Sequence, residues 1–185
     1  MQTAFKNRPL QFLEDRIVDV DTDVEVMMSW EAPIMEKCAK YICENGGDIL
    51  EIGFGMGICA DYIQAESINS HTIVEIHPDI IAKAQEWASD KPNVTIIEGD
   101  WLSVNLDKYD GIFLDTYGDP GIDNFKDFAI DKSNSGANVT YWNNDQSQTN
   151  KYNFDNISWG FINITPPDNN YTDISSRYYM PKVTI

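Results

Sequence analysis

Residues 48–58 combine a short apolar run with closely spaced glycines. The apolar run 49–52 is typical of a buried strand. Glycines follow at three alternate positions, Gly53, Gly55 and Gly57. Glycine permits positive φ angles and lets a ligand approach the main chain closely. A strand, a glycine turn and a helix in this order therefore predict a loop for a nucleotide-like ligand, the alternative being a tight turn without a ligand.

The spacing of these glycines separates several kinds of nucleotide loop. A dinucleotide fingerprint has glycine at its first, third and sixth positions, and the sixth position counted from Gly53 is Ile58. A Walker loop ends in Gly-Lys, and no lysine lies between Lys40 and Lys83. A nicotinamide-linked oxidoreductase is therefore the weakest interpretation. Glu51, just before the glycines, is similar to the acid in the S-adenosylmethionine loop of class I methyltransferases.

Acidic residues also stand at the ends of the next three strand-like runs. Glu75 lies 20 residues after Gly55, about where an acid binds the ribose hydroxyls in such folds. Asp100 and Asp115 follow the next two runs, and Trp101 stands beside Asp100. Because ligands of open α/β sheets bind beyond the carboxyl ends of the strands, we expect these side chains to converge on one crevice. There Asp100 would accept from an adenine amino group, and Trp101 would offer its main-chain N–H.

Strand-like and helix-like stretches alternate, which predicts a parallel sheet with helices on both faces. Strands are expected at 48–52, 72–76, 94–98, 110–115, 138–142, 157–164 and 177–185. Helices are expected within 26–45, from about 57 to 66, from 78 to 89 and around 121–130. The polar segment 143–156 has no apolar stripe, so a loop is expected where a crossover helix is usual. The last two strands predict an antiparallel edge.

These elements predict an α/β, Rossmann-like class I methyltransferase fold. It has a mostly parallel seven-stranded sheet with an antiparallel C-terminal edge, and little helix after the fifth strand. A chain of 185 residues suits one domain, expected at 26–185 after an N-terminal lead-in at 1–25.

The amino-acid composition limits the classes of molecule that this chain is expected to bind. The formal net charge of −17 disfavours nucleic acid and anionic membranes as partners. It either steers a cationic substrate or mainly keeps the protein soluble. No apolar run suits a transmembrane helix or a secretory signal. Three cysteines in helix-like stretches fit reduced thiols, and the two histidines make no zinc pattern with them. We expect a cytoplasmic monomer or homodimer without a bound metal.

Four short motifs occur together in this chain. They are Val26-Met27-Met28-x-Trp30-Glu31-x-Pro33-x-Met35, Leu50-Glu51-Ile-Gly53-Phe-Gly55-Met56, Asp115-Thr-Tyr117 and Arg177-Tyr-Tyr179. Together they resemble the guanidino-group N-methyltransferases, a family that includes guanidinoacetate methyltransferase and the fungal protein-arginine δ-N-methyltransferase. The resemblance covers about residues 24–185, and its specific part is the Trp-Glu pair combined with the Asp-Thr-Tyr run.

This resemblance implies S-adenosyl-L-methionine as cofactor and S-adenosyl-L-homocysteine as product. The implied cofactor contacts are Met27, Met35, Gly53, Phe54, Gly55, Met56, Gly57, Ile58, Cys59, Glu75, Ile76, His77, Asp100, Trp101 and Asp115. The implied substrate contacts are Glu31, Asp115, Asn144 and Asp145, with Asp115 and Glu31 as the catalytic pair. The structural alternatives are a helix N-terminal acid for Glu31 and core packing for the methionines.

The chemistry of a guanidino acceptor explains why two carboxylates are needed. A guanidinium stays protonated near neutral pH because its pKa is roughly 12.5–13.8, and protonated nitrogen is a poor nucleophile. A carboxylate can hold the planar group through two hydrogen bonds and accept a proton as the N–C bond forms. We therefore expect methylation of a small guanidino compound such as guanidinoacetate. The alternatives are another small acceptor, protein arginine, or a non-catalytic subunit that binds S-adenosylmethionine.

Overall fold

The computed structural model describes residues 4–145, 147–168, 172 and 174–185, and one large sheet forms its centre. The strands of this sheet are β4 (Asp48–Ile52), β5 (Ser70–Glu75), β6 (Val94–Glu98), β7 (Tyr109–Leu114), β8 (Ser133–Tyr141), β9 (Ile157–Asn163) and β10 (Arg177–Thr184). Their order is β6-β5-β4-β7-β8-β10-β9. The first five in this order are parallel, and β10 is antiparallel to both of its neighbours. The predicted fold and its antiparallel edge are confirmed.

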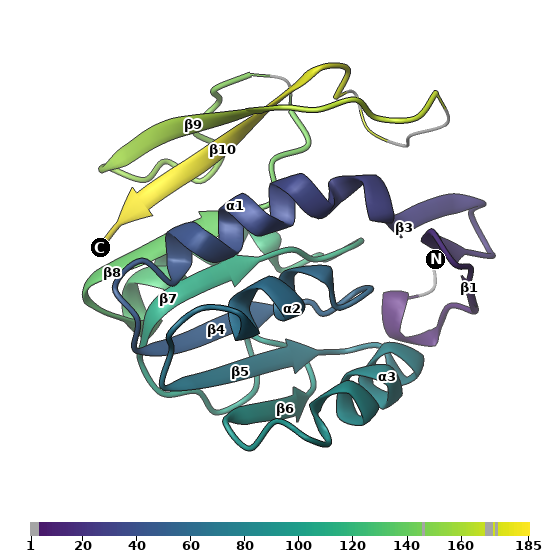
Figure 1. The fold of residues 1–185 in the computed structure, drawn as a ribbon, viewed down its shortest axis with the longest axis horizontal. Coiled ribbons are helices and arrows are strands. Elements are labelled where there is room, and N and C mark those ends of the chain that lie inside the picture. The colour runs from purple at the N-terminus through teal and green to yellow at the C-terminus, as the bar shows by residue number, and fades with distance from the viewer. Residues whose placement is uncertain (1–3, 146, 169–171, 173) are drawn as a thin grey trace.

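Three helices cover one face of this sheet, in front of it in Figure 1. These three are α1 (Ala32–Ile42), α2 (Ile58–Gln64) and α3 (Pro78–Ala88). A fourth helix, α4 (Phe125–Lys132), packs on the other face. Short 3-10 turns are η1 (Phe5–Asn7), η2 (Ser29–Glu31) and η3 (Ile122–Asn124). α1 packs against α2, β7 and β8, and α3 packs against β6. Within the described residues, no helix is both long and apolar enough to cross a membrane.

The N-terminal region is folded rather than a plain lead-in. It forms a three-stranded antiparallel sheet of β1 (Leu10–Phe12), β2 (Arg16–Asp19) and β3 (Val24–Met28). The helix expected within 26–45 is confirmed as α1, which begins at Ala32 and carries Pro33 in its first turn. Proline is tolerated in the first helical turn alone, so Pro33 limits how far the helix extends backward. β3 therefore crosses the expected domain boundary at residue 25, and Figure 1 places this sheet beyond the arrowhead of β5.

The central strands alternate side chains between two apolar layers, as the pleat of a strand requires. Ile49 of β4 and Phe113 of β7 face the layer under α1 and α2. Leu50 of β4, with Ile112 and Leu114 of β7, faces the opposite layer, which contains α4. Both layers are buried, which explains why these strands are nearly continuous apolar runs.

The polar segment 143–156 covers part of the second face without forming a helix in its described part. Tyr152 and Phe154 are 6% and 3% exposed, although the segment around them is polar. Their rings pack edge-on against Phe125 of α4, with centroids 5.4 and 6.0 Å apart. Tyr152 also packs against Tyr141 of β8 at 4.7 Å. The expected loop is confirmed, and two aromatic anchors take the place of a helix.

The aromatic anchors predict a stability effect. Phe154→Ala should lower the free energy of unfolding by about 3 kcal/mol, because it leaves a cavity beside Phe125. Urea unfolding followed by circular dichroism measures the change. Gln148→Ala, at an exposed position of the same segment, is the control. Equal stability of the two variants would show that the segment is only a surface loop.

Candidate functional site

The strand order brings the predicted residues to one edge of the sheet. Ile52 of β4 pairs with Val74 of β5 and with Leu114 of β7. The residues that follow, Gly53 and Asp115, therefore lie side by side. Gly53 has a φ of 91°, and a Cβ there would collide with the main-chain oxygen of Asp115. Glycine is required at this position by both the backbone angle and the space.

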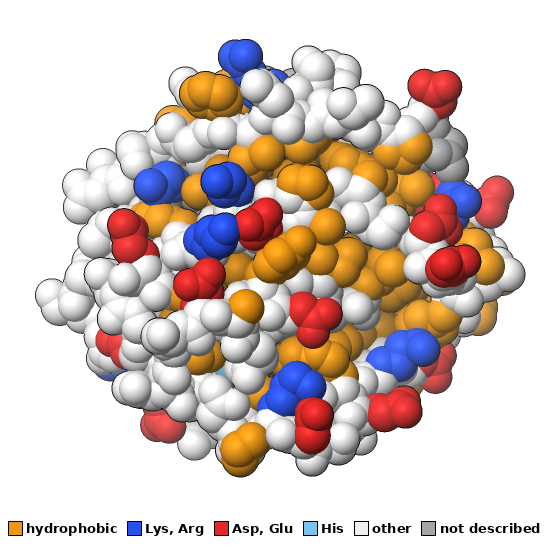
Figure 2. Space-filling view, viewed as in Figure 1, with side chains coloured by type: hydrophobic (Ala, Val, Ile, Leu, Met, Phe, Trp, Pro, Cys, Tyr) orange, Lys and Arg blue, Asp and Glu red, His pale blue; other side chains and the backbone are white. Residues whose placement is uncertain are grey.

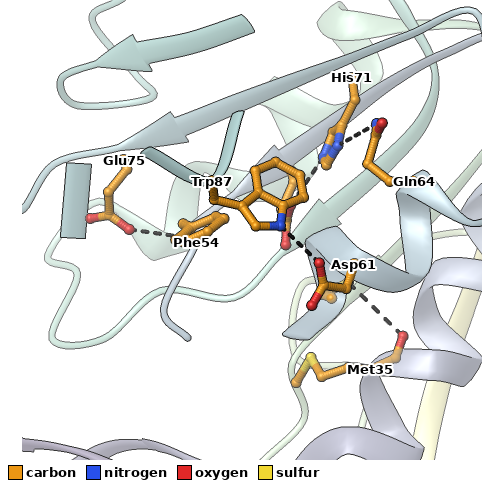
Figure 3. Close-up of polar contacts among 9 residues, drawn as sticks. Met35, Phe54, Asp61, Gln64, His71, Glu75 and Trp87 are labelled. Carbon is orange, nitrogen blue, oxygen red and sulfur yellow. Dashed lines mark hydrogen bonds and ion pairs between the residues drawn. The ribbon is translucent and has the colours of Figure 1, made fainter. Parts of the chain in front are cut away.

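The Glu75 carboxylate holds the glycine loop. Its Oε2 accepts from the Phe54 N–H at 2.9 Å, and its Oε1 accepts from the N–H groups of Ile76 and His77 at 2.8 and 2.9 Å. Figure 3 shows this side chain directed at the backbone of Phe54. A carboxylate oxygen accepts more than one hydrogen bond, so Glu75 keeps acceptor capacity toward a ligand diol. The side chain is 5% exposed and borders the main cavity.

A cavity of about 790 Å³ opens at this edge, within the usual size range of small-molecule sites. Five carboxylate side chains and two cationic side chains are among its lining residues. The acids are Glu51, Glu75, Asp100, Asp115 and Asp119, and the cations are Lys6 and Arg8. The Arg8 guanidinium is itself paired with the buried Asp19. Figure 2 shows further acidic side chains at the end of the molecule that carries the N-terminal sheet, so the electrostatics favour a cationic ligand.

Asp115 is the acid most strongly perturbed by this environment. Burial raises the pKa of its carboxyl to about 7, and the negative charges of Glu51 and Glu75 add to the increase. Asp115 therefore holds its proton far more tightly than an ordinary aspartate. A cation bound beside it would favour the ionised form, because opposite charges lower a carboxyl pKa.

Glu51 is the most deeply buried of these acids, with no measurable exposure. Its Oε2 lies 3.0 Å from Nε2 of His71 on β5. Its Oε1 has no hydrogen-bond partner among the described residues, although Glu51 borders the cavity. Burial raises the pKa of the Glu51 carboxyl, while the contact with His71 opposes that increase. A cationic ligand group would satisfy the remaining oxygen.

Most of the predicted contact residues border the cavity. They are Met27, Met35, Gly53, Phe54, Gly55, Cys59, Glu75, Ile76, Asp100, Trp101, Asp115 and Asn144. Trp101 is fixed at the cavity wall by a hydrogen bond of 2.7 Å from its Nε1 to Asp119. Met27 contributes its sulfur, which accepts from the Met56 N–H at 3.3 Å. Asn144 is held there because its neighbour Asn143 donates its own N–H to the Tyr178 hydroxyl at 2.9 Å.

Six predicted contact residues lie outside the described lining: Glu31, Met56, Gly57, Ile58, His77 and Asp145. Met56 and Gly57 lead into α2, which begins at Ile58. The His77 ring anchors the N-terminal region, because its Nε2 lies 2.8 Å from the Arg8 carbonyl oxygen and its Nδ1 accepts from the Asp79 N–H. Asp145 is exposed and accepts from the Ser147 N–H.

Glu31 is buried at the start of α1, where its Oε1 accepts from the Met28 N–H at 2.7 Å. Glu31 also lies near Tyr178, which is fully buried. Burial raises the pKa of the Tyr178 phenol well above its ordinary value, and the charges of Asp115 and Glu31 both contribute. Of the two predicted catalytic acids, Asp115 borders the cavity and Glu31 lies outside its described lining.

Several residues that line the cavity were not predicted from the sequence. Phe5, Lys6 and Arg8 come from the N-terminal region, whose fold had not been anticipated. Trp142 lies at the end of β8 and stacks near Tyr178, with ring centroids 5.3 Å apart. The available signal for Trp142 was its place at the end of the predicted strand 138–142, two residues before the predicted Asn144.

The sequence profile of the guanidinoacetate N-methyltransferase family matches residues 15–158. The chain belongs to this family. The match covers the N-terminal sheet from residue 15, the glycine loop, and the strand ends that carry Glu75, Asp100 and Asp115. The family predicted from the four motifs is thus confirmed.

Curated relatives carry the name protein arginine N-methyltransferase 2. The Kluyveromyces lactis protein is 39% identical over 129 residues, which is 63% of this chain and 31% of the relative. The Emericella nidulans protein is 38% identical over 139 residues, which is 70% of this chain and 32% of the relative. This chain thus matches about a third of the length of these relatives.

Solved methyltransferases have a similar fold. The N-methyltransferase NodS from Bradyrhizobium japonicum, in complex with S-adenosyl-L-homocysteine, matches with a TM-score of 0.65 and 10% identity, covering 84% of this chain and 87% of that one. The O-methyltransferase from Bacillus cereus, also in complex with S-adenosyl-L-homocysteine, matches at 0.59 and 14%, covering 85% and 82%. Family and fold are those of S-adenosylmethionine-dependent methyltransferases, as predicted. The individual site roles, the compartment, the partners and the metal-free site stay predictions.

The raised pKa of Asp115 gives a pH-dependent test of this geometry. Because the pKa in the folded protein, about 7, exceeds the ordinary value, ionisation of Asp115 costs stability, and the cost grows from about pH 4 to pH 7. Asp115→Asn should therefore stabilise the ligand-free protein more at pH 8 than at pH 5, by about 2 kcal/mol. Thermal unfolding at both pH values measures the difference, with Asp127→Asn on exposed α4 surface as control. A gain independent of pH would contradict the assignment.

Proposed function

We propose that this chain binds S-adenosylmethionine and methylates a guanidino nitrogen. The observation that carries the proposal is the Asp115 carboxyl at the edge of an acidic cavity in a chain of this family. A guanidinium is a planar cation, and carboxylates bind it with good geometry. The cavity therefore offers what a guanidino acceptor needs, a negatively charged group shielded from bulk solvent.

The lining residues also suit the cofactor. Glu75 has acceptor capacity for the two ribose hydroxyls, and Ile76 and Trp101 provide walls for the adenine ring. Glu51 has a buried oxygen available for the ammonium group. When bound, S-adenosylmethionine supplies a methyl group on a positively charged sulfur. The concentration of acids around it stabilises this cation before any acceptor enters.

The chain's own residues would then orient and deprotonate the acceptor. Asp115 holds the guanidinium in its ionised form and accepts a proton as the N–C bond forms. Glu31 is the second carboxylate in this proposal, and it acts from the N-terminus of α1. Holding the acceptor plane in one orientation contributes more than the proton transfer, because positioning removes most of the entropic cost of reaction.

The acceptor has two candidates. A small compound such as guanidinoacetate is the first, since the family carries its name. Arginine within a protein is the second, and the names of the curated relatives favour it. The excess of acids over cations in the lining also favours an acceptor without its own carboxylate. If the chain binds S-adenosylmethionine but methylates no acceptor, both candidates are wrong.

Calorimetry and a product assay test the proposal directly. The purified protein is titrated with S-adenosylmethionine and then assayed for S-adenosylhomocysteine with guanidinoacetate, free arginine or an arginine-containing peptide. Binding with product from one of these acceptors supports the proposal and names the acceptor class. Binding without product from any of them supports a non-catalytic domain. Absence of binding would overturn the proposed function and leave the family and fold unchanged.

The two acids predict different behaviour on substitution. Glu31→Gln keeps an oxygen for the Met28 N–H but removes the charge, so turnover should fall by about 100-fold or more while the affinity for S-adenosylmethionine stays within about threefold. Asp115→Asn should reduce turnover at least as strongly. Glu36→Gln, on the same helix as a partly exposed surface acid, is the matched control. Full turnover in Glu31→Gln would remove this residue from the mechanism.

A further inference from the structure

A buried histidine lies behind the acid that faces the cofactor region. His71 on β5 has no measurable exposure, and the proposed mechanism does not use it. Its Nε2 lies 3.0 Å from Glu51 Oε2, and its Nδ1 lies 3.3 Å from the Gln64 side-chain nitrogen on α2. Figure 3 shows dashed contacts leaving the ring of His71 in two directions, one of them to the side chain of Gln64.

The two contacts of His71 determine which of its ring nitrogens carries the proton. An amide nitrogen only donates, so Gln64 donates to Nδ1 of His71. His71 then carries its proton on Nε2 and donates it to Glu51 Oε2. This contact occupies one oxygen of Glu51 and holds the carboxylate in a single orientation.

The other oxygen of Glu51 is left for a ligand. Glu51 Oε1 is buried without a hydrogen-bond partner in the described part of the chain. The titratable groups around Glu51 are His71, the Cys43 and Cys59 thiols, and the carboxyls of Glu75 and Asp115. Of the two thiols, that of Cys59 also forms a hydrogen bond with the Glu51 carboxylate. A thiol is a weak donor, and the two carboxylates repel a third negative charge. A cationic ligand group would give Oε1 the strong donor that the thiol does not provide, and a buried acceptor without such a donor is costly.

We propose that His71 is a positioning residue that fixes Glu51 so that Oε1 binds the ammonium group of the cofactor's amino-acid end. Gln64 supports this role by selecting the tautomer of His71. The inference rests on the proposed binding of S-adenosylmethionine, and it concerns affinity for one part of that cofactor. Neither His71 nor Gln64 borders the cavity in the described lining, so both act through Glu51.

A purely structural role for His71 is the competing explanation. Its ring packs edge-on against Trp87 of α3, with centroids 6.2 Å apart. Trp87 in turn packs against Phe54 of the glycine loop and donates to Asp61 of α2 at 2.8 Å. Loss of His71 could therefore loosen the whole loop. A loosened loop would weaken every nucleoside ligand, whereas loss of a fixed Glu51 weakens only ligands that carry the ammonium group.

Two ligands separate these explanations. S-adenosylhomocysteine carries the amino-acid end, and 5′-methylthioadenosine has the same nucleoside without it. His71→Leu should weaken S-adenosylhomocysteine by about tenfold and methylthioadenosine by less than about twofold, measured by calorimetry. His71→Gln, which can return a donor to Glu51, should restore most of the lost affinity. In a Glu51→Gln background, His71→Leu should have little further effect, because the charged partner is already gone.

The other possible results of these binding measurements would contradict either the role of His71 or the proposed function. Equal weakening of both ligands, or no weakening of either, would overturn the positioning role of His71. If His71→Leu fails to fold, Gln64→Leu tests the same chain of contacts from its other end, and it should show a smaller loss confined to S-adenosylhomocysteine. Failure of the native protein to bind either ligand would instead overturn the proposed function.

Discussion

The hydrogen bonds that one carboxylate accepts from three main-chain N–H groups hold together the edge of the sheet where the cavity lies. Glu75 accepts from Phe54 in the glycine loop and from Ile76 and His77 at the end of its own strand. It thereby joins the turns that follow β4 and β5, two adjacent parallel strands. The cavity walls, the start of α3 and the anchoring of the N-terminal region through His77 all depend on this junction. Hydrogen bonds to a charged acceptor are strong enough for that purpose.

Local patterns in the sequence predicted the elements around this junction well. β4 and β6 have the expected bounds, and the glycine spacing and the acid at Glu75 come together as anticipated. Features that depend on distant partners were not predictable. Val24–Met28 forms a strand because β2 pairs with it, and Glu51 meets His71 only because β4 and β5 are aligned. Single aromatic residues such as Tyr152 carry no periodic signal, so their burial is invisible in the sequence.

The acids of the cavity oppose stability while they serve binding. Glu51, Glu75 and Asp115 lie close enough that burial and mutual repulsion affect Asp115 strongly. Such a cluster persists because the surrounding strands and loops hold it in place. Two cationic ligands, a sulfonium compound and a guanidinium, would relieve the repulsion one after the other. The same electrostatics therefore explain both the strain of the ligand-free site and its selectivity for positive charge.

The segment after β8 has two neighbours, the cavity at the carboxyl edge of the sheet and helix α4 on one face. Near its start, Asn144 borders the cavity, and further along Tyr152 and Phe154 pack beside α4. A separate helix would have divided these tasks between two pieces of chain. Here a change that reshapes the acceptor end also moves a packing anchor a few residues away. Evolution of a new acceptor preference through this segment is therefore constrained by folding, and substitutions that broaden specificity there will need compensating changes around Phe125.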